Sequence, residues 1–255
     1  MKYMKKLLFA SALLLLMPLM AQAQHDDFGV WYSLGAEKKV NKQLSIGAET
    51  EFRTRNDSKT ADRWSIGVEA DYKIIKGVKA SVGYTFLYDN NGESLSYNYD
   101  NTGAVASLNN WRPSYWGHRH RVTASLQGSK SFGRLGLSLR ERWQYTYRPE
   151  KTVQRYDFDN GYWEPKSIKS KAKNVLRSRL QLDYDLPNWK ADPYASVELS
   201  NAWNIQKIRY TLGADWKIKK THTFSFYYRY QDIRNDDFDG EPDMHIIGVS
   251  YKFKF

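Results

Sequence analysis

The chain has 255 residues, no cysteine, a net charge of +11 and a mean hydropathy of −0.71. The lack of cysteine excludes disulfides, thioether-linked haem and thiolate metal sites, and no stretch beyond residue 23 is apolar enough for a membrane-spanning helix. Because 15% of the residues are aromatic and tyrosine leads with 19, the composition favours β-strands that meet membrane interfaces.

The first 23 residues have the three parts of an export signal. Three lysines among the first six residues precede the apolar run LLFASALLLLMPLM, and Ala-Gln-Ala at 21–23 is a small-x-small cleavage site. We expect 1–23 to be cleaved and 24–255 to form a single domain, with the net charge lowered from +11 to +8 by the loss of three lysines. An exported basic protein favours outer-membrane lipid and lipopolysaccharide as partners, and nucleic acid is not expected.

From residue 28 onward, apolar and polar residues alternate. In 44–53, for example, Leu44 and Ile46 share one strand face, whereas Glu49 and Glu51 share the other. A period of two predicts strands. Eleven segments show this pattern: 28–36, 44–53, 63–74, 78–88, 116–129, 135–147, 175–186, 193–200, 207–218, 223–231 and 244–255.

Two features distinguish a membrane barrel from a soluble one. Aromatic residues gather at the two ends of the segments, and aliphatic residues occupy their middles. We therefore predict an all-β fold, a transmembrane up-and-down antiparallel β-barrel with short periplasmic turns and longer extracellular loops in an outer membrane. The connections alternate in length accordingly, with short ones near 38–42, 75–77, 130–134, 187–191 and 219–222 and long ones at 54–62, 89–115, 148–174 and 232–243.

The expected strand number is ten to twelve. Eleven segments make the first strand, 28–36, run in the same direction as the last, whereas single-chain bacterial barrels have even strand numbers. Three alternatives stay open: the chain holds a further strand, 28–36 is not a full wall strand, or the N-terminal segment threads the lumen. We favour twelve strands.

The chain ends in HIIGVSYKFKF, in which Tyr251, Phe253 and Phe255 share one face. This segment resembles the C-terminal strand of outer-membrane barrels, whose terminal aromatic residue is recognised by the barrel-assembly machinery. The same strand also has to close the sheet, because no free sheet edge persists in lipid. We therefore expect these three residues to act as an assembly signal and the assembly machinery to be a partner.

Longer stretches resemble a known family. DFGVWYSLGAEKKVNKQLSIGAETEFR, KIRYTLGADWKIKKTHTFSFYYRYQD and the closing IIGVSYKFKF are similar to the outer-membrane β-barrel family known as domain of unknown function 2490. The likeness spans essentially the whole mature chain. It implies the barrel fold and the outer-membrane location, and it supplies no activity, cofactor or catalytic residue.

The polar strand faces are rich in charge and are expected to line the lumen. Two readings stay open: a basic lining selects anions or acidic sugars, or opposite charges pair across a narrow barrel and fill it. The residues expected to line the lumen are Arg53, Arg63, Arg119, Arg121, Arg140, Arg142, Arg177, Arg179, Arg209, Arg229, Glu49, Glu51 and Glu69.

An enzyme is the less favoured interpretation. His118 and His120 share a strand face in GHRHR, but no serine accompanies them on that face, as a lipid hydrolase requires. Two imidazoles without a further ligand are also a weak metal site. Glu141 breaks the apolar face between Leu139 and Trp143, which indicates a bulge or an interfacial position or, as the alternative, a membrane-facing catalytic carboxylate.

We therefore expect a non-enzymatic protein without metal or cofactor, either a structural barrel or a narrow passive channel for small anionic solutes. Aromatic residues and lysines in the loops 89–115 and 148–174 offer an alternative, a surface protein that binds sugar or lipopolysaccharide.

Overall fold

The computed structural model describes residues 26–187, 189–219, 221–234 and 241–255. The expected export signal, 1–23, and the expected mature start at Gln24 lie outside the described residues. Within the described ranges, no helix is long and apolar enough to cross a membrane.

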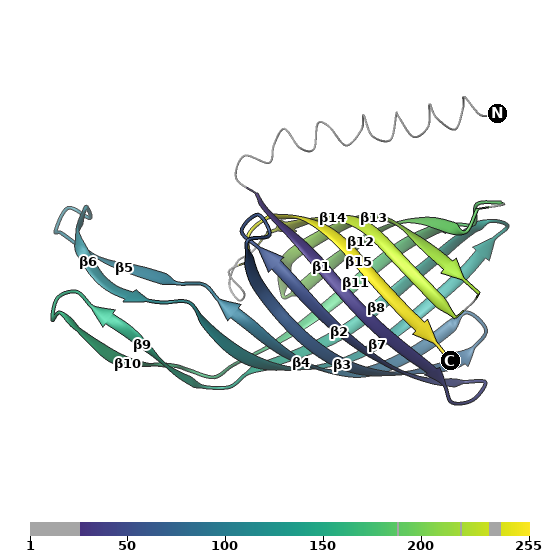
Figure 1. The fold of residues 1–255 in the computed structure, drawn as a ribbon, viewed down its shortest axis with the longest axis horizontal. Coiled ribbons are helices and arrows are strands. Elements are labelled where there is room, and N and C mark those ends of the chain that lie inside the picture. Colours follow the sequence, from purple (N-terminus) through teal and green to yellow (C-terminus); the bar gives the residue numbers. More distant parts are fainter. Residues whose placement is uncertain (1–25, 188, 220, 235–240) are drawn as a thin grey trace, which may run out of the picture.

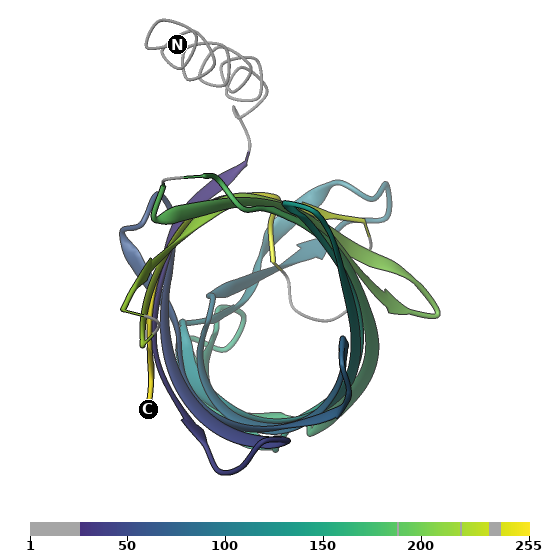
Figure 2. The same cartoon turned by 90° about the vertical axis from the view of Figure 1, so that its right-hand side faces the viewer.

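Eleven strands close into a barrel (Figures 1 and 2). The predicted barrel is confirmed, and each of the eleven alternating segments forms one wall strand, so the favoured number of twelve is wrong. The strands are β1 (Asp27–Lys39), β2 (Leu44–Arg55), β3 (Thr60–Ile75), β4 (Val78–Asn91), β7 (Tyr115–Phe132), β8 (Leu135–Arg148), β11 (Lys171–Tyr184), β12 (Ala191–Ala202), β13 (Asn204–Ile218), β14 (His222–Ile233) and β15 (Met244–Lys254).

The barrel closes where β1 meets β15, and this pairing is parallel. The prediction of antiparallel pairing throughout is wrong at this one seam, because an odd number of up-and-down strands leaves the first and last strands running the same way. The seam is long, extending from Asp27 opposite Met244 to Glu37 opposite Lys254. Segment 28–36 is therefore a full wall strand.

The two ends of the barrel differ, and we call them the turn end and the hairpin end. The turn end carries the short connections that the sequence predicts, as well as the C-terminal Phe255, whose amide donates to Glu37 O at 3.0 Å. The hairpin end carries the start of β1 and the connections that follow β2, β4, β8, β12 and β14. The predicted long loop at 54–62 is instead a tight turn at 56–59, in which Asn56, Asp57 and Ser58 adopt positive φ.

The predicted loops 89–115 and 148–174 are mostly strand. They contain two hairpins, β5 (Ser94–Tyr99) with β6 (Val105–Arg112) and β9 (Lys151–Asp157) with β10 (Tyr162–Ile168). The two hairpins pair through β6 and β9 into one four-stranded sheet, in the order β10-β9-β6-β5. Figure 1 shows both hairpins extending beyond the end of the barrel.

The outer surface of the barrel is apolar. Leu34, Ile66 and Val82, on three different strands, expose 60%, 60% and 61% of their surface. Exposure of this size on aliphatic side chains suits contact with lipid and not with water. The alternation that marks the strands therefore places the apolar face outside and the charged face in the lumen.

Glu141 lies on this outer surface in a regular part of β8. Its neighbours on β7 and β11 pair without a register shift, so the expected bulge is absent from this described segment. Ser178, directly opposite on β11, donates its hydroxyl to Glu141 Oε2 at 2.6 Å. A single hydroxyl partner, and not a bulge, accommodates the carboxyl group.

Candidate functional site

The barrel encloses a cavity of about 540 Å³ with a mainly charged lining. Of the thirteen charged residues expected to line the lumen, Arg119 is absent from this lining; it is buried and pairs with Asp89 of the neighbouring strand at 2.9 Å. The other twelve line the cavity: Arg53, Arg63, Arg121, Arg140, Arg142, Arg177, Arg179, Arg209, Arg229, Glu49, Glu51 and Glu69.

Three adjacent strands, β7, β8 and β11, carry half of the lysines and arginines that line the cavity. Within this group, Arg142 lies directly opposite Arg177, and Arg140 directly opposite Arg179. Like charges facing each other across a strand pair cost roughly 0.2–1 kcal/mol per pair, so stability alone does not favour this arrangement. We use the name basic wall for the five arginines of these strands that line the cavity: Arg121 on β7, Arg140 and Arg142 on β8, and Arg177 and Arg179 on β11.

Glu198 of β12 binds several arginines at once. Its carboxylate accepts from Arg177 at 2.5 Å and from Arg140 at 2.9 Å, and Arg209 of β13 lies 3.8 Å away. Its side chain is only 8% exposed. One buried carboxylate thus partly neutralises cations from three strands, which is the geometry of a carboxylate-binding site.

Arg142 reaches across part of the lumen. Its Nη2 donates to Glu69 Oε2 at 2.9 Å, although β4 and β7 separate the two strands that carry these residues. The strand positions between them in register with Glu69 are Gly83 and Thr123, whose small side chains leave room for this ion pair. The contact occupies part of the cavity beside β4 and β7.

The wall formed by β2 and β3 carries the opposing negative charge. Glu49, Glu51, Glu69 and Asp71 line the cavity there. Glu51 accepts from Arg53 at 2.6 Å, while Glu69 binds Arg142 of the basic wall. The lumen therefore has a basic side and an acidic side, and the field between them orients a charged solute.

An aromatic row crosses the lumen wall at the seam. Paired positions on β12, β13, β14, β15 and β1 are, in order, Tyr194, Gly213, Tyr227, Gly248 and Trp31. A Cβ atom at Gly248 would lie 1.9 Å from Cζ of Tyr227, so this glycine makes room for a ring that lies against the wall.

Arginines stack on this aromatic row. The guanidinium carbons of Arg53, Arg209 and Arg229 lie 3.6, 5.3 and 5.2 Å from the ring centre of Trp31, within the range of cation–π attraction. Trp31 also packs with Met244 and Ile246. The seam thus adds an aromatic contact to each of these three arginines, two of which, Arg53 and Arg209, also lie near a carboxylate.

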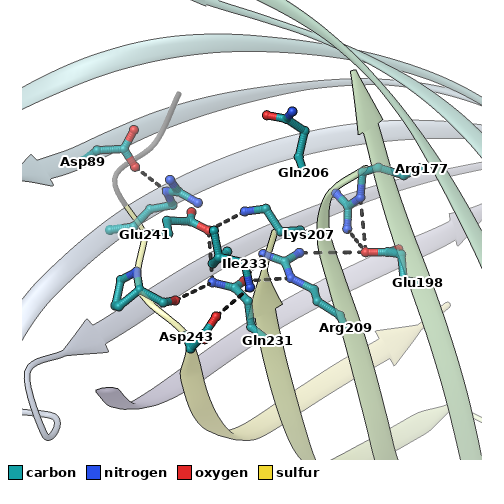
Figure 3. Close-up of polar contacts among 12 residues, drawn as sticks. Asp89, Arg177, Glu198, Gln206, Lys207, Arg209, Gln231, Ile233, Glu241 and Asp243 are labelled. Atoms are coloured by element: carbon teal, nitrogen blue, oxygen red, sulfur yellow. Dashed lines mark hydrogen bonds and ion pairs between the residues drawn. The ribbon is translucent and has the colours of Figure 1, made fainter. Parts of the chain in front are cut away.

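Near the hairpin end, a carboxylate from a connection enters the lumen (Figure 3). Glu241 binds Lys207 and accepts from Gln231 Nε2 at 3.1 Å, and Gln231 in turn accepts from Arg209. Burial would raise the pKa of Glu241, but the positive charges of Lys207, Arg209 and Arg63 outweigh this effect and hold its pKa well below the usual range. Glu241 thus shows that a carboxylate binds among these cations.

Sequence reasoning missed several of these residues. Asp89 pairs with Arg63 and Arg119, yet it fell at the start of an expected loop. Glu241 fell in the expected loop 232–243, and Trp31 in a segment whose place in the wall was open. For Asp89, the signal was present. In 78–88 the residues with odd numbers form the polar face that points into the lumen, and Asp89 continues this alternation.

His118 and His120 lie on the outer surface of the barrel. His120 Nδ1 is 2.7 Å from the hydroxyl of Tyr84, and the ring of His118 packs against Phe86 and His120. These contacts join the pair to tyrosine and phenylalanine, and no serine contact is among them. In the described part of the chain, no three His, Asp or Glu side chains gather as a metal site.

The C-terminal aromatics belong to the seam strand. Tyr251 forms a hydrogen bond with His222 Nδ1 at 2.7 Å, and the rings of Phe253 and Phe255 stack with centres 5.5 Å apart. β15 pairs with both β14 and β1, so it performs the closing function expected of it.

Comparisons with known proteins agree with this fold. A family model described as "Protein of unknown function (DUF2490)" matches residues 28–241, so the chain belongs to this family and the resemblance seen in the sequence is confirmed. No curated protein matches the sequence.

Three solved structures are similar. The translocator domain of the autotransporter NalP from Neisseria meningitidis has a TM-score of 0.56 and 14% identity, over 82% of this chain and 80% of that one. The β domain of the Bordetella autotransporter BrkA has a TM-score of 0.47 and 11% identity, over 82% of this chain and 78% of that one. The CymD monoaromatic hydrocarbon channel has a TM-score of 0.39 and 9% identity, over 78% of this chain and 66% of that one. Of the three, the NalP likeness exceeds 0.5, and at this identity it shows the fold alone.

Proposed function

We propose that this member of the DUF2490 family is a non-enzymatic outer-membrane protein that passively conducts small anionic solutes through its basic lumen. Export by residues 1–23 and assembly through Tyr251, Phe253 and Phe255 bring it to the membrane, where lipid and lipopolysaccharide surround the apolar outer surface. Arginine-lined pores select anions in this way.

The main observation behind this proposal is the environment of Arg179. Arg179 lines the cavity within the basic wall, and among the described residues it has no ion pair. Its Nε is buried without a hydrogen-bond partner, and the same holds for Nε of Arg140 and Arg142. A buried charged donor without an acceptor is costly. An anion entering the cavity is attracted by this group of guanidinium charges, which the described carboxylates neutralise only in part.

The size of the path supports small solutes. The cavity of about 540 Å³ falls in the range of sites for molecules of drug size or less. The Arg142–Glu69 contact and the arginines stacked on Trp31 project into the same space. Both occupy part of the lumen, which favours small solutes over large ones.

Reversal potential in a salt gradient tests the proposal. We expect single channels of the refolded protein in a planar bilayer to be anion-selective, and the double variant Arg140→Gln, Arg179→Gln to lose most of that selectivity. Arg134→Gln, at the turn between β7 and β8, serves as the control and should conduct as the wild type does. Silent protein shown to be inserted and folded would instead establish a filled lumen.

A further inference from the structure

Toward its tips, one face of the hairpin sheet is apolar or aromatic, whereas Thr152, Gln154 and Ser167 lie on the same face nearer the barrel. A direct row of paired residues crosses all four strands as Leu95, Trp111, Tyr156 and Trp163. Toward the tips, paired residues continue the same face. We call this set the apolar hairpin face: Leu95, Tyr97, Tyr99, Val105, Leu108, Trp111, Tyr156, Phe158 and Trp163.

The apolar hairpin face is open to its surroundings. Tyr99 and Val105 are 63% and 59% exposed, and Trp163 is 49% exposed. Rings in its centre contact one another, with 5.6 Å between the centres of Trp111 and Trp163 and 5.4 Å between those of Tyr156 and Trp163. The result is a continuous exposed patch, which marks a binding surface more often than a solvated one.

Register shows which way this face points. The pairing of Asn91 with Tyr115 in the barrel continues as Ser94 with Arg112 in the first hairpin, three residues farther along each strand. Across the second hairpin and between the two hairpins, the register is likewise unchanged. Since alternate residues point to opposite faces, the apolar hairpin face continues the lumen-facing side of β4, β7, β8 and β11.

The opposite face of the hairpin sheet is mainly polar, although Val153, Tyr162 and Ile168 share it. It carries Asn98, which binds Asp159 at 3.0 Å, and the ion pair of Arg155 with Glu164. The sheet therefore turns its polar side outward and its apolar side toward the axis above the basic wall. A lipid-facing sheet would have the reverse arrangement.

We propose that the apolar hairpin face binds the apolar body of an organic anion whose charged group then enters the basic lumen. This inference rests on the proposed function and names its substrate class: carboxylates that carry an apolar ring or chain. The continuity of the face with the basic wall selects this occupant. A neutral apolar molecule gains nothing from the arginines below, and an inorganic anion gains nothing from the rings above.

Phenylacetate tests the inference, with acetate as the same charged group lacking the ring. In a planar bilayer, phenylacetate should block the chloride current more strongly when added at the hairpin end than at the turn end, whereas acetate should show no such difference. The double variant Trp111→Ala, Trp163→Ala should weaken the block by phenylacetate roughly tenfold and leave the chloride current unchanged.

Tyr162→Ala provides a matched control. Tyr162 precedes Trp163 on β10, is similarly exposed at 52%, and lies on the polar face. The Tyr162→Ala variant should bind phenylacetate as the wild type does. Equal affinity of the wild type and the double variant would overturn the inference, as would a wild-type dimer that the double variant converts to monomer, because the face would then join two copies.

Binding measured without current separates the two proposals. Isothermal titration of phenylacetate into the refolded protein does not require an open lumen. Saturable binding that the double variant weakens, in a protein that conducts no chloride, would retain the hairpin site and reject the channel. Anion-selective current with no effect of the double variant on phenylacetate would retain the channel and reject the hairpin site.

Discussion

The barrel strands β4, β7, β8 and β11 pass into β5, β6, β9 and β10 without a register shift at the junction, but the same faces carry opposite residue types in the two regions. In the barrel, the apolar side faces outward and the arginines face the lumen. Beyond the barrel, the apolar side faces the axis and the polar side faces outward. The point of inversion marks where lipid stops surrounding the wall, because only lipid makes an outward apolar face favourable.

The ion pairs of the barrel and of the hairpin sheet also differ. In the barrel, Glu198 is shared by Arg140, Arg177 and Arg209 in a nearly buried cluster. In the hairpin sheet, Glu164 pairs with Arg155 and with no other cation of the described residues, and both side chains are more than a quarter exposed. A shared, buried carboxylate holds a wall together, whereas an isolated and wetter pair contributes little.

Removal of Glu198 should produce the largest effect. Glu198→Gln leaves three arginines without their common carboxylate, and we expect a loss of about 3–5 kcal/mol in the free energy of unfolding. Glu164→Gln, the matched change in the hairpin sheet, should cost less than about 1 kcal/mol. Urea unfolding in lipid vesicles measures both. Equal costs would show that the two regions do not differ in electrostatic coupling.

The second-largest difference between the barrel and the hairpin sheet should come from a charge placed on the apolar side of each. Leu180→Lys places a charge on the outer surface of β11 and should cost roughly 2–4 kcal/mol of stability in the bilayer. Leu95→Lys places the same charge on the apolar hairpin face, outside the lipid, and should leave insertion and stability nearly unchanged. The exposed fractions are 48% and 46%, so the pair differs in surroundings and not in exposure. A large cost at Leu95 would place that residue in lipid.

Glycine substitutions should show a smaller contrast. Gly248→Ala forces a Cβ into the ring of Tyr227 and should cost about 1–3 kcal/mol by overpacking. Gly103, at the tip of the first hairpin, has nothing within 4 Å but a φ of +83°, so Gly103→Ala should cost only about 1 kcal/mol through backbone strain. Thermal unfolding compares the two. A tolerated Gly248→Ala would mean that Tyr227 moves freely away from the wall.

The Glu241 ion pair should give the smallest effect, and one that depends on pH. Because the folded-state pKa lies well below the ordinary value of 4.5, the pair stabilises the fold above that value, and the contribution is lost as pH falls through the folded pKa. Glu241→Gln should therefore lower stability by about 1 kcal/mol at pH 7. The difference from wild type should vanish only well below pH 4.5. A difference that vanishes near pH 6 would contradict this ion pair.

Much of the barrel followed from the sequence, because a period of two is a local signal. All eleven segments became wall strands, and the inward set of arginines and glutamates followed from alternation. The strand number was misjudged because evenness is a family tendency and not a physical requirement. The seam between Asp27 and Met244 needs a contact between the two ends of the chain, which no local pattern reports.

The hairpin sheet was harder to predict because its pattern is broken. Bulges at Ser96/Tyr97 and Asn98/Tyr99 shift the alternation of β6 relative to β5. Six of its nine apolar residues were noticed in the sequence only as loop aromatics: Tyr97, Tyr99, Trp111, Tyr156, Phe158 and Trp163. Their common face depends on the pairing of β6 with β9, a contact between two segments that are about 45 residues apart.

A charge-dependent labelling rate tests the central claim, that the basic wall lines a path open to solutes. The chain has no cysteine, so Ser196→Cys introduces a single thiol into the cavity lining, and Ser131→Cys introduces one at the exposed turn end as the reference. We predict that an anionic thiosulfonate reacts with the lumen thiol roughly tenfold faster, relative to a cationic one, than it does at the reference. Equal ratios at the two sites, or no reaction at the lumen thiol, would contradict the account.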